Sequence, residues 1–217
     1  MTTVEGSLLT EDDMEIMRIL HNAFRRDAAR LVTVAERFGT VDAETHDAVL
    51  LGWHGFSSGL HHHHTIEDDH IWPHLRDKLA DRPDDLAVLD DMESEHSLID
   101  PALAAIEAAF DDPETGRDEV AERIDGLLTL LAGHLAHEEK DAFPLMKGWL
   151  TTREWAVINR TAMKELSFSE IAELGPYILD SAPPPDVRRV LAEFPAPLRL
   201  VHRFWWNPRY QRARRWE

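Results

Sequence analysis

The sequence predicts an all-α protein, an antiparallel up-down four-helix bundle followed by a C-terminal helical extension. Apolar residues recur at helical spacing along most of the 217-residue chain, and no convincing run alternates as a β-strand would. Proline and glycine breaks divide the pattern into long amphipathic segments joined by short turns. Long helices with short connections are typical of antiparallel bundles.

Four long helices are expected, over about residues 10–38, 42–79, 84–110 and 117–150. The first begins with Thr10 followed by acidic residues, which is typical of a capped helix start, and Gly39 ends it. Pro83 and Pro113 interrupt the helical pattern between the later segments. In the second helix, three glycines are expected to mark a late start or a bend: Gly52, Gly55 and Gly59.

From residue 151 the composition changes, so we divide the chain into a bundle over 1–150 and an extension over 151–217. Residues 151–182 are expected to form two shorter helices. From Pro197 onward the chain has six arginines and one acid, together with five aromatic residues: Phe204, Trp205, Trp206, Tyr210 and Trp216. We interpret this tail as folding back over the acidic bundle. Docking to a partner, a second subunit or a membrane surface is the alternative.

Composition limits the classes of function. A formal net charge of -18 argues against nucleic acid as a partner. No apolar run approaches the roughly 20 residues of a membrane span, and the N-terminal residues lack the features of a signal peptide, so we expect a cytoplasmic protein. Without cysteine, the chain can form no disulfide or iron–sulfur site, and any metal must be held by imidazole and carboxylate groups.

Two segments, one in the second predicted helix and one in the fourth, match in register. Each has a His-x-x-x-Glu pair followed by an aromatic residue and proline: His63 and Glu67 before Trp72-Pro73, and His134 and Glu138 before Phe143-Pro144. Residues four apart share one face of a helix, so each pair can converge on one metal. Mixed nitrogen and oxygen ligands suit iron or manganese, and zinc remains open.

The first and third helices each carry a single histidine, His21 and His96, and we expect both to join the metal site. His64 is an additional candidate ligand, although the residue next to a ligand points about 100° away on a helix. His70 and Asp141 occupy equivalent positions in the two matched segments. They are interpreted either as a pair that orients a ligand or as a plain surface pair.

These motifs resemble the hemerythrin-like, or HHE cation-binding, domain family over about residues 10–150. The resemblance implies a centre of two iron ions bridged by two glutamates, with an oxo or hydroxo group beside them. It implies these roles: Glu67 and Glu138 as bridges, His21 and His63 on one iron, and His96 and His134 on the other.

The chain departs from the oxygen-carrying members of that family in two places. Those members have His-x-x-x-His on the third helix, where this chain has His96-x-x-x-Asp100, and His-x-x-x-x-Asp on the fourth, where it has His134-x-x-x-Glu138. One imidazole of the carrier set is therefore missing, which argues against simple reversible oxygen carriage.

The sequence accordingly predicts a non-haem di-iron protein that binds or senses O2, NO or peroxide, in a response to oxidative or nitrosative stress. A catalase-like enzyme that removes peroxide is the alternative from another class, and iron storage or a structural metal bundle is a third. Two iron ions are expected in preference to manganese or zinc. The sequence assigns no catalytic residue and no cofactor beyond the metal.

Overall fold

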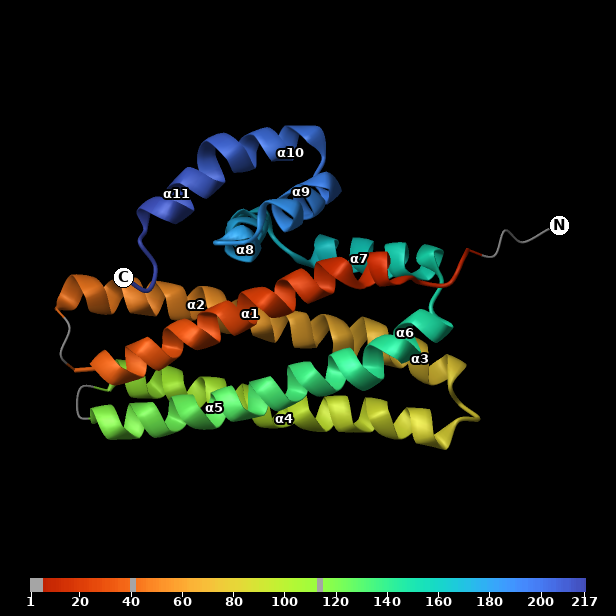
Figure 1. The fold of residues 1–217 in the computed structure, drawn as a ribbon, viewed down its shortest axis with the longest axis horizontal. Helices are drawn as coiled ribbons and strands as arrows, with labels where there is room; N and C mark the ends of the chain where they lie inside the picture. Colours follow the sequence, from red (N-terminus) through yellow and green to blue (C-terminus); the bar gives the residue numbers. More distant parts are fainter. Residues whose placement is uncertain (1–5, 40–41, 113–114) are drawn as a thin grey trace.

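The computed structural model describes residues 6–39, 42–112 and 115–217, and its regular elements in these ranges are helices (Figure 1). The all-α prediction is confirmed. Long helical rods lie side by side: α1 (Glu11–Arg37); α2 (Ala43–Ile66) continued by η1 (Glu67–Ile71) and α3 (Trp72–Lys78); α4 (Pro83–Asp111); and α5 (Arg117–His137) continued by η2 (Glu138–Ala142) and α6 (Phe143–Trp149). The break expected at Pro113, and the first five residues used in judging the N-terminus, lie outside the described ranges.

The first helix begins and ends as its sequence predicts. The backbone N–H of Thr10 donates to Asp13 Oδ2 at 2.8 Å, which closes a capping box at the start of α1. Gly39, just beyond its end, has φ of 75°, a left-handed conformation that costs glycine little because it has no Cβ.

Three π-helical turns interrupt the helices, and each ends two residues before a proline: η1 before Pro73, η2 before Pro144, and η3 (His202–Trp206) before Pro208. In η1 the N–H of Trp72 donates to the carbonyl of Glu67, five residues back. Proline has no N–H, and its ring clashes with the carbonyl four residues earlier, so a wider turn relieves the conflict. The periodicity of the sequence did not indicate these turns.

Two apolar clusters fill the bundle on either side of a band of buried polar residues. The Trp53 cluster includes Phe24, Leu31, Trp53, Phe56, Ile106 and Leu131. The Trp72 cluster includes Met14, Trp72, Leu75, Leu89, Met92 and Phe143. The polar band between them is therefore shielded from water along the bundle axis in both directions.

The extension packs over α1 and α2 (Figure 1). Its elements are α7 (Thr152–Glu165), α8 (Phe168–Leu179), α9 (Pro184–Glu193), α10 (Ala196–Val201), η3 and α11 (Asn207–Arg212). The two shorter helices predicted within 151–182 are α7 and α8. Arg26 of α1 holds α8 by donating to the carbonyl oxygens of Tyr177, at 3.0 Å, and Asp180, at 2.7 Å. The domain division at residue 150 stays a prediction.

The glycines of α2 do not mark a late start, because the helix begins at Ala43 and runs through all of them. They make room for aromatic rings of the extension instead. A Cβ added to Gly52 would lie 2.4 Å from the ring of Trp216, and one added to Gly59 would lie 3.4 Å from the ring of Tyr177. The first of these distances is too short for any side chain, so Gly52 is needed for the observed contact.

The basic aromatic tail folds back only in part. The N–H of Trp216 donates to the carbonyl of Ala48 in α2 at 3.0 Å, and Tyr210 is buried. Phe204 and Trp205 are 59% and 67% exposed. Docking of the tail to a partner, a second subunit or a membrane surface stays a prediction. None of the helices in the described ranges has both the length and the apolar character needed to cross a membrane.

Candidate metal centre

The polar band consists of seven side chains, each at most 3% exposed, supplied by all the long rods. They are His21 from α1, His63, His64 and Glu67 from α2 and the start of η1, His96 from α4, and His134 and Glu138 from α5 and the start of η2. The six residues predicted as ligands, together with the additional candidate His64, thus lie close together. Three groups within this set have potential ligand atoms within 4.8 Å of one another: His64, His96 and His134; His21, His63 and Glu138; and Glu67, His134 and Glu138.

The carboxylate of Glu67 lies between two imidazoles from different helices. Its Oε1 is 3.4 Å from Nε2 of His63, and its Oε2 is 3.4 Å from Nε2 of His96. The two oxygens therefore face opposite sides of the centre, and the carboxylate has the orientation needed to contact two cations at once.

The carboxylate of Glu138 is also surrounded by imidazoles. Its Oε2 lies 3.1 Å from Nε2 of His21 and 3.8 Å from Nε2 of His134. His63 Nε2 is 3.9 Å from the same oxygen. Glu138 therefore connects the His21 side of the centre to the His134 side.

Several polar atoms of the centre are buried without a hydrogen-bond partner: both oxygens of Glu67 and of Glu138, Nε2 of His96 and of His134, and both ring nitrogens of His64. Burying a carboxylate without a partner costs several kcal/mol. A cation bound among these atoms would satisfy them. The donor set of imidazoles and carboxylates, without any thiolate, fits a transition metal such as iron.

A second layer of carboxylates orients three of the imidazoles. The pairs are His21 Nδ1 with Glu139 Oε1 at 2.9 Å, His96 Nδ1 with Asp68 Oδ1 at 2.8 Å, and His134 Nδ1 with Glu95 Oε2 at 2.9 Å. An acceptor on Nδ1 holds its proton there and leaves Nε2 free to bind a metal. The sequence motifs alone did not indicate these carboxylates. The register of the two matched segments carried a signal, because Asp68 and Glu139 each directly follow a candidate bridging glutamate.

The pair proposed between His70 and Asp141 is not formed. His70 faces the extension, with its Nε2 3.0 Å from Glu165 Oε1. Asp141 lies 2.8 Å from Lys140 Nζ and is also close to His137. Neither residue is among the buried residues of its π-helical turn, which are Glu67 and Ile71 in η1 and Glu138 and Ala142 in η2.

The charges of the protein's own groups favour a bound cation. Burial, and then the nearby Glu138, raise the pKa of Glu67 well above its usual value. Burial opposes ionisation of Glu138, but His21, His63 and other imidazoles hold its pKa well below the usual range. For His21, burial disfavours protonation, yet Glu138 and Glu139 raise its pKa to about 9. These pKa shifts favour protonation of Glu67 and His21, and a metal bound at the same atoms would displace the protons.

Aromatic rings line one side of the centre. The ring of Phe24 lies 5.5 Å from that of His63, and the ring of Phe143 lies 5.5 Å from that of His21, measured between centroids. Both phenylalanines are fully buried. Two apolar rings therefore border the His21 and His63 side, where the carboxylate of Glu139 also contacts His21.

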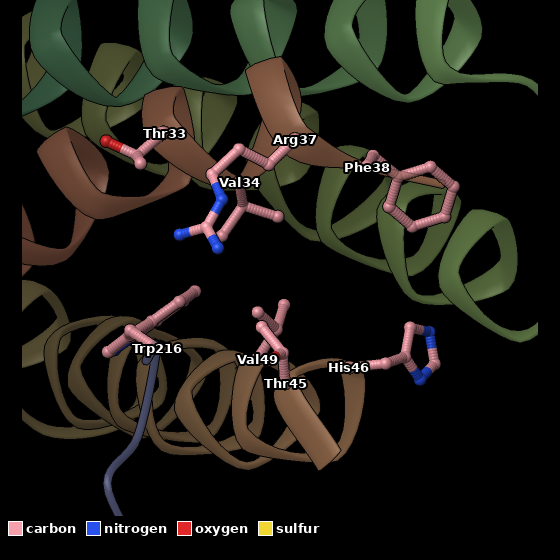
Figure 2. A pocket seen from close by; sticks show the side chains of 8 residues that line it. All are labelled: Thr33, Val34, Arg37, Phe38, Thr45, His46, Val49 and Trp216. Carbon is pink, nitrogen blue, oxygen red and sulfur yellow. The ribbon is translucent and has the colours of Figure 1, made fainter. Parts of the chain in front are cut away.

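A small pocket elsewhere in the protein is unrelated to this centre. It lies where α1 ends and α2 begins, and Figure 2 shows Trp216 of the tail beside it. Its lining residues are Thr33, Val34, Arg37, Phe38, Thr45, His46, Val49 and Trp216. None of them belongs to the polar band.

A set of imidazoles and carboxylates buried between long helices is typical of helical metal-binding proteins. The family model described as the Hemerythrin HHE cation binding domain matches residues 12–146, which is well over half of the chain. The chain therefore belongs to the hemerythrin family, as its motifs predicted. Comparisons with curated proteins and with solved structures gave no match.

Proposed function

We propose that the polar band holds two iron ions, with Glu67 and Glu138 as bridging carboxylates. In this proposal His21 and His63 bind one iron, and His96 and His134 bind the other. The observation that carries it is the buried pair of carboxylates without hydrogen-bond partners, each lying between imidazoles of different helices. Family membership supports a bound cation. Two carboxylates placed as bridges favour a pair of transition-metal ions such as iron over a single zinc ion.

The same proposal includes an up-and-down antiparallel topology for the bundle, within residues 1–150. The order of the apolar clusters supports it. Along α1 the chain passes the Trp72 cluster, then the polar band, then the Trp53 cluster, and along the rod that begins with α2 the order is reversed. It reverses again along α4, and once more along the rod that begins with α5.

We further propose that the centre binds or senses a small ligand such as O2, NO or peroxide. Bound iron would supply the redox chemistry and an open coordination position, and the protein supplies the surroundings. The apolar walls formed by Phe24 and Phe143 exclude water and favour a small, weakly polar ligand.

A peroxide-removing enzyme is the second candidate, and one observation supports it. Glu95 accepts hydrogen bonds from the buried His134, at 2.9 Å, and from the half-buried His137, at 2.8 Å. A carboxylate between a buried and a more accessible imidazole can hold a proton near the centre, as peroxide disproportionation requires. Oxygen evolution from hydrogen peroxide separates the two candidates. No turnover above that of free iron would exclude the enzyme.

The proposed centre is tested by metal analysis of protein purified without a tag and loaded with iron. We expect two irons per chain and, after oxidation, the near-ultraviolet absorption of an oxo-bridged pair. Glu67→Gln and Glu138→Gln should each lose the second iron and this absorption. Glu93→Gln, which alters an exposed carboxylate on α4, is the matched control and should keep both. One zinc per chain, or two irons with an unchanged spectrum in both bridge variants, would overturn the proposal.

A further inference from the structure

The outermost part of the extension is a helical rod whose two faces differ. The rod consists of α10, η3 and α11, which follow one another without a break from residue 196 to residue 212. One face is formed by His202, Trp206 and Tyr210, each at most 8% exposed, and η3 and α11 pack on α8. The other face of the rod points away from α8.

Large apolar residues lie on that other face. Leu200 and Phe204 are 57% and 59% exposed. Each is two positions from a buried residue of the rod, and two positions correspond to about 200° around a helix. Trp205 is 67% exposed, more than any of the other six tryptophans of the chain. We call these three residues the outer strip. Single exposed apolar residues are normal on a protein surface, whereas adjacent ones indicate an interaction surface.

Arginines without counter-charges lie beside the outer strip. Arg203 and Arg209 are exposed, and within the described ranges neither forms an ion pair with a carboxylate. The guanidinium of Arg203 lies 5.4 Å from the centre of the Phe204 ring. In α1, by contrast, Arg18 and Arg25 each pair with a glutamate, at 2.9 and 2.8 Å. Free cations beside exposed rings suit a partner that is both negatively charged and partly apolar.

We propose that the outer strip and its two arginines dock the protein on the surface of an anionic lipid bilayer. The rings of Phe204 and Trp205 enter the boundary between headgroups and acyl chains, and Arg203 and Arg209 contact lipid phosphates. Tryptophan and arginine suit this boundary because each has an apolar body and a polar end. The rod lies in the plane of the membrane, as amphipathic helices with basic and aromatic residues do.

The acidic bundle does not prevent this docking. Residues 1–150 contain 33 of the 41 acidic residues and 12 of the 23 basic ones, whereas residues 151–217 contain 8 and 11. In Figure 1, α10 and α11 follow one edge of the molecule, and α4 and α5 follow the opposite edge. A helix is about 10–12 Å across. The intervening helices therefore keep the charges of α4 and α5 beyond the Debye length of physiological salt, roughly 8 Å.

A second copy of this chain fits the outer strip less well. A symmetric pair formed through this face would bring the arginines of both copies together, and like charges repel. A copy that offered its acidic bundle would make a head-to-tail contact, which leads to an open filament unless the rotation closes a ring. An anionic bilayer requires neither arrangement, because its whole surface carries the complementary charge.

Co-sedimentation of the full-length protein with lipid vesicles tests the docking. We expect binding to phosphatidylcholine vesicles that contain phosphatidylserine, little binding to phosphatidylcholine alone, and weaker binding as salt is added. Arg209→Ala should weaken binding about fivefold, through the loss of one cation near the surface. Phe204→Ser should weaken it about tenfold, through the loss of a buried ring. Leu98→Ser and Arg117→Ala change exposed residues of α4 and α5 at the opposite edge, and these controls should bind like the wild-type protein.

The fluorescence of Trp205 tests whether the outer strip enters the bilayer. Bromine on a lipid acyl chain quenches a tryptophan that comes close to it. Brominated vesicles should quench part of the fluorescence of the wild-type protein, and vesicles without bromine should not. The quenched part should be absent from Trp205→Phe, which keeps an aromatic ring and should still bind. Equal quenching in Trp205→Phe and wild type would contradict the placement of this residue.

Two results would overturn the docking itself. One is the absence of binding to vesicles that contain phosphatidylserine, and the other is equal binding by Arg209→Ala, Phe204→Ser and the wild-type protein. Self-association that Phe204→Ser abolishes, seen by analytical ultracentrifugation without any vesicle binding, would assign the outer strip to a second copy instead. All the substituted residues are exposed, so circular dichroism should show unchanged folding. The docking does not depend on the proposed iron centre, and neither result would bear on that centre.

Discussion

Glu95 supplies the sharpest test of how the second layer of carboxylates supports the metal. Its two oxygens accept hydrogen bonds from His134 Nδ1, at 2.9 Å, and from His137 Nδ1, at 2.8 Å. Glu95→Gln keeps the shape and removes the charge, and an amide can accept through only one of its two terminal atoms. At least one of the two hydrogen bonds is then lost, and His134 is no longer held with its Nε2 toward the centre.

The expected magnitude follows from the role of Glu95, which contacts a proposed ligand and not the metal itself. Replacing a group that orients a metal-binding histidine typically lowers metal affinity about 10- to 100-fold, which corresponds to roughly 1.4–2.7 kcal/mol. Only the iron proposed to bind His134 should be affected. Competition with a chelator should therefore show one iron released more readily and the other unchanged.

Glu93→Gln is the control, because Glu93 lies two residues before Glu95 on α4 but pairs with Arg76 at the surface, at 3.0 Å. It should match the wild-type protein in the competition assay. Equal release of both irons from Glu95→Gln and from wild type would refute the view that Glu95 positions a ligand. Release of both irons together would instead indicate general loosening of the bundle.

Three further predictions concern stability. Burial raises the pKa of Glu154, but the hydrogen bonds from Lys78 and from Thr151 at the helix cap outweigh burial and hold the pKa at about 2, against the usual 4.5. The stabilisation from the ionised Glu154 is therefore complete above about pH 4.5 and is lost as the pH falls toward 2. Glu154→Gln should lower Tm by about 2–4 °C at pH 6 and leave it unchanged at pH 2. Gly52→Ala should displace Trp216 and speed hydrogen exchange over 207–217, while urea denaturation of the bundle changes little. Leu131→Ala, which removes side-chain atoms from the Trp53 cluster, should cost about 2–5 kcal/mol in urea denaturation; a cost below 1 kcal/mol would contradict the packing.

The helices and the candidate ligands could be predicted from the sequence because both depend on the spacing of residues along one helix. The two His-x-x-x-Glu pairs need only the geometry of one helix to bring imidazole and carboxylate together. His21 and His96 followed because each is the only histidine of a helix that must face the same centre. The structure brings these residues together, although their binding of metal stays a proposal.

Features that depend on how helices are rotated against each other could not be predicted in the same way. The contact of Glu95 with His134 joins two helices, and nothing in the spacing along either helix indicates it. The glycines of α2 look like helix breakers from the sequence alone. They face rings of the extension instead: Trp216, which is more than 160 positions away in the chain, meets Gly52, and Tyr177 meets Gly59. Both contacts form only after the extension has folded.

The aromatic-proline pairs that helped to align the two matched segments have a structural cause that links them to the candidate bridges. A proline follows the first residue of each π-helical turn by six positions, from 67 to 73, from 138 to 144 and from 202 to 208. The third turn, η3, lies in the extension, away from the polar band and without a glutamate. Proline spacing therefore accounts for the wide turn wherever it occurs. In the bundle, Glu67 and Glu138 are each the first residue of such a turn. The histidine four residues before each glutamate therefore lies in the last regular turn of the α-helix, and the widened turn begins at the glutamate itself.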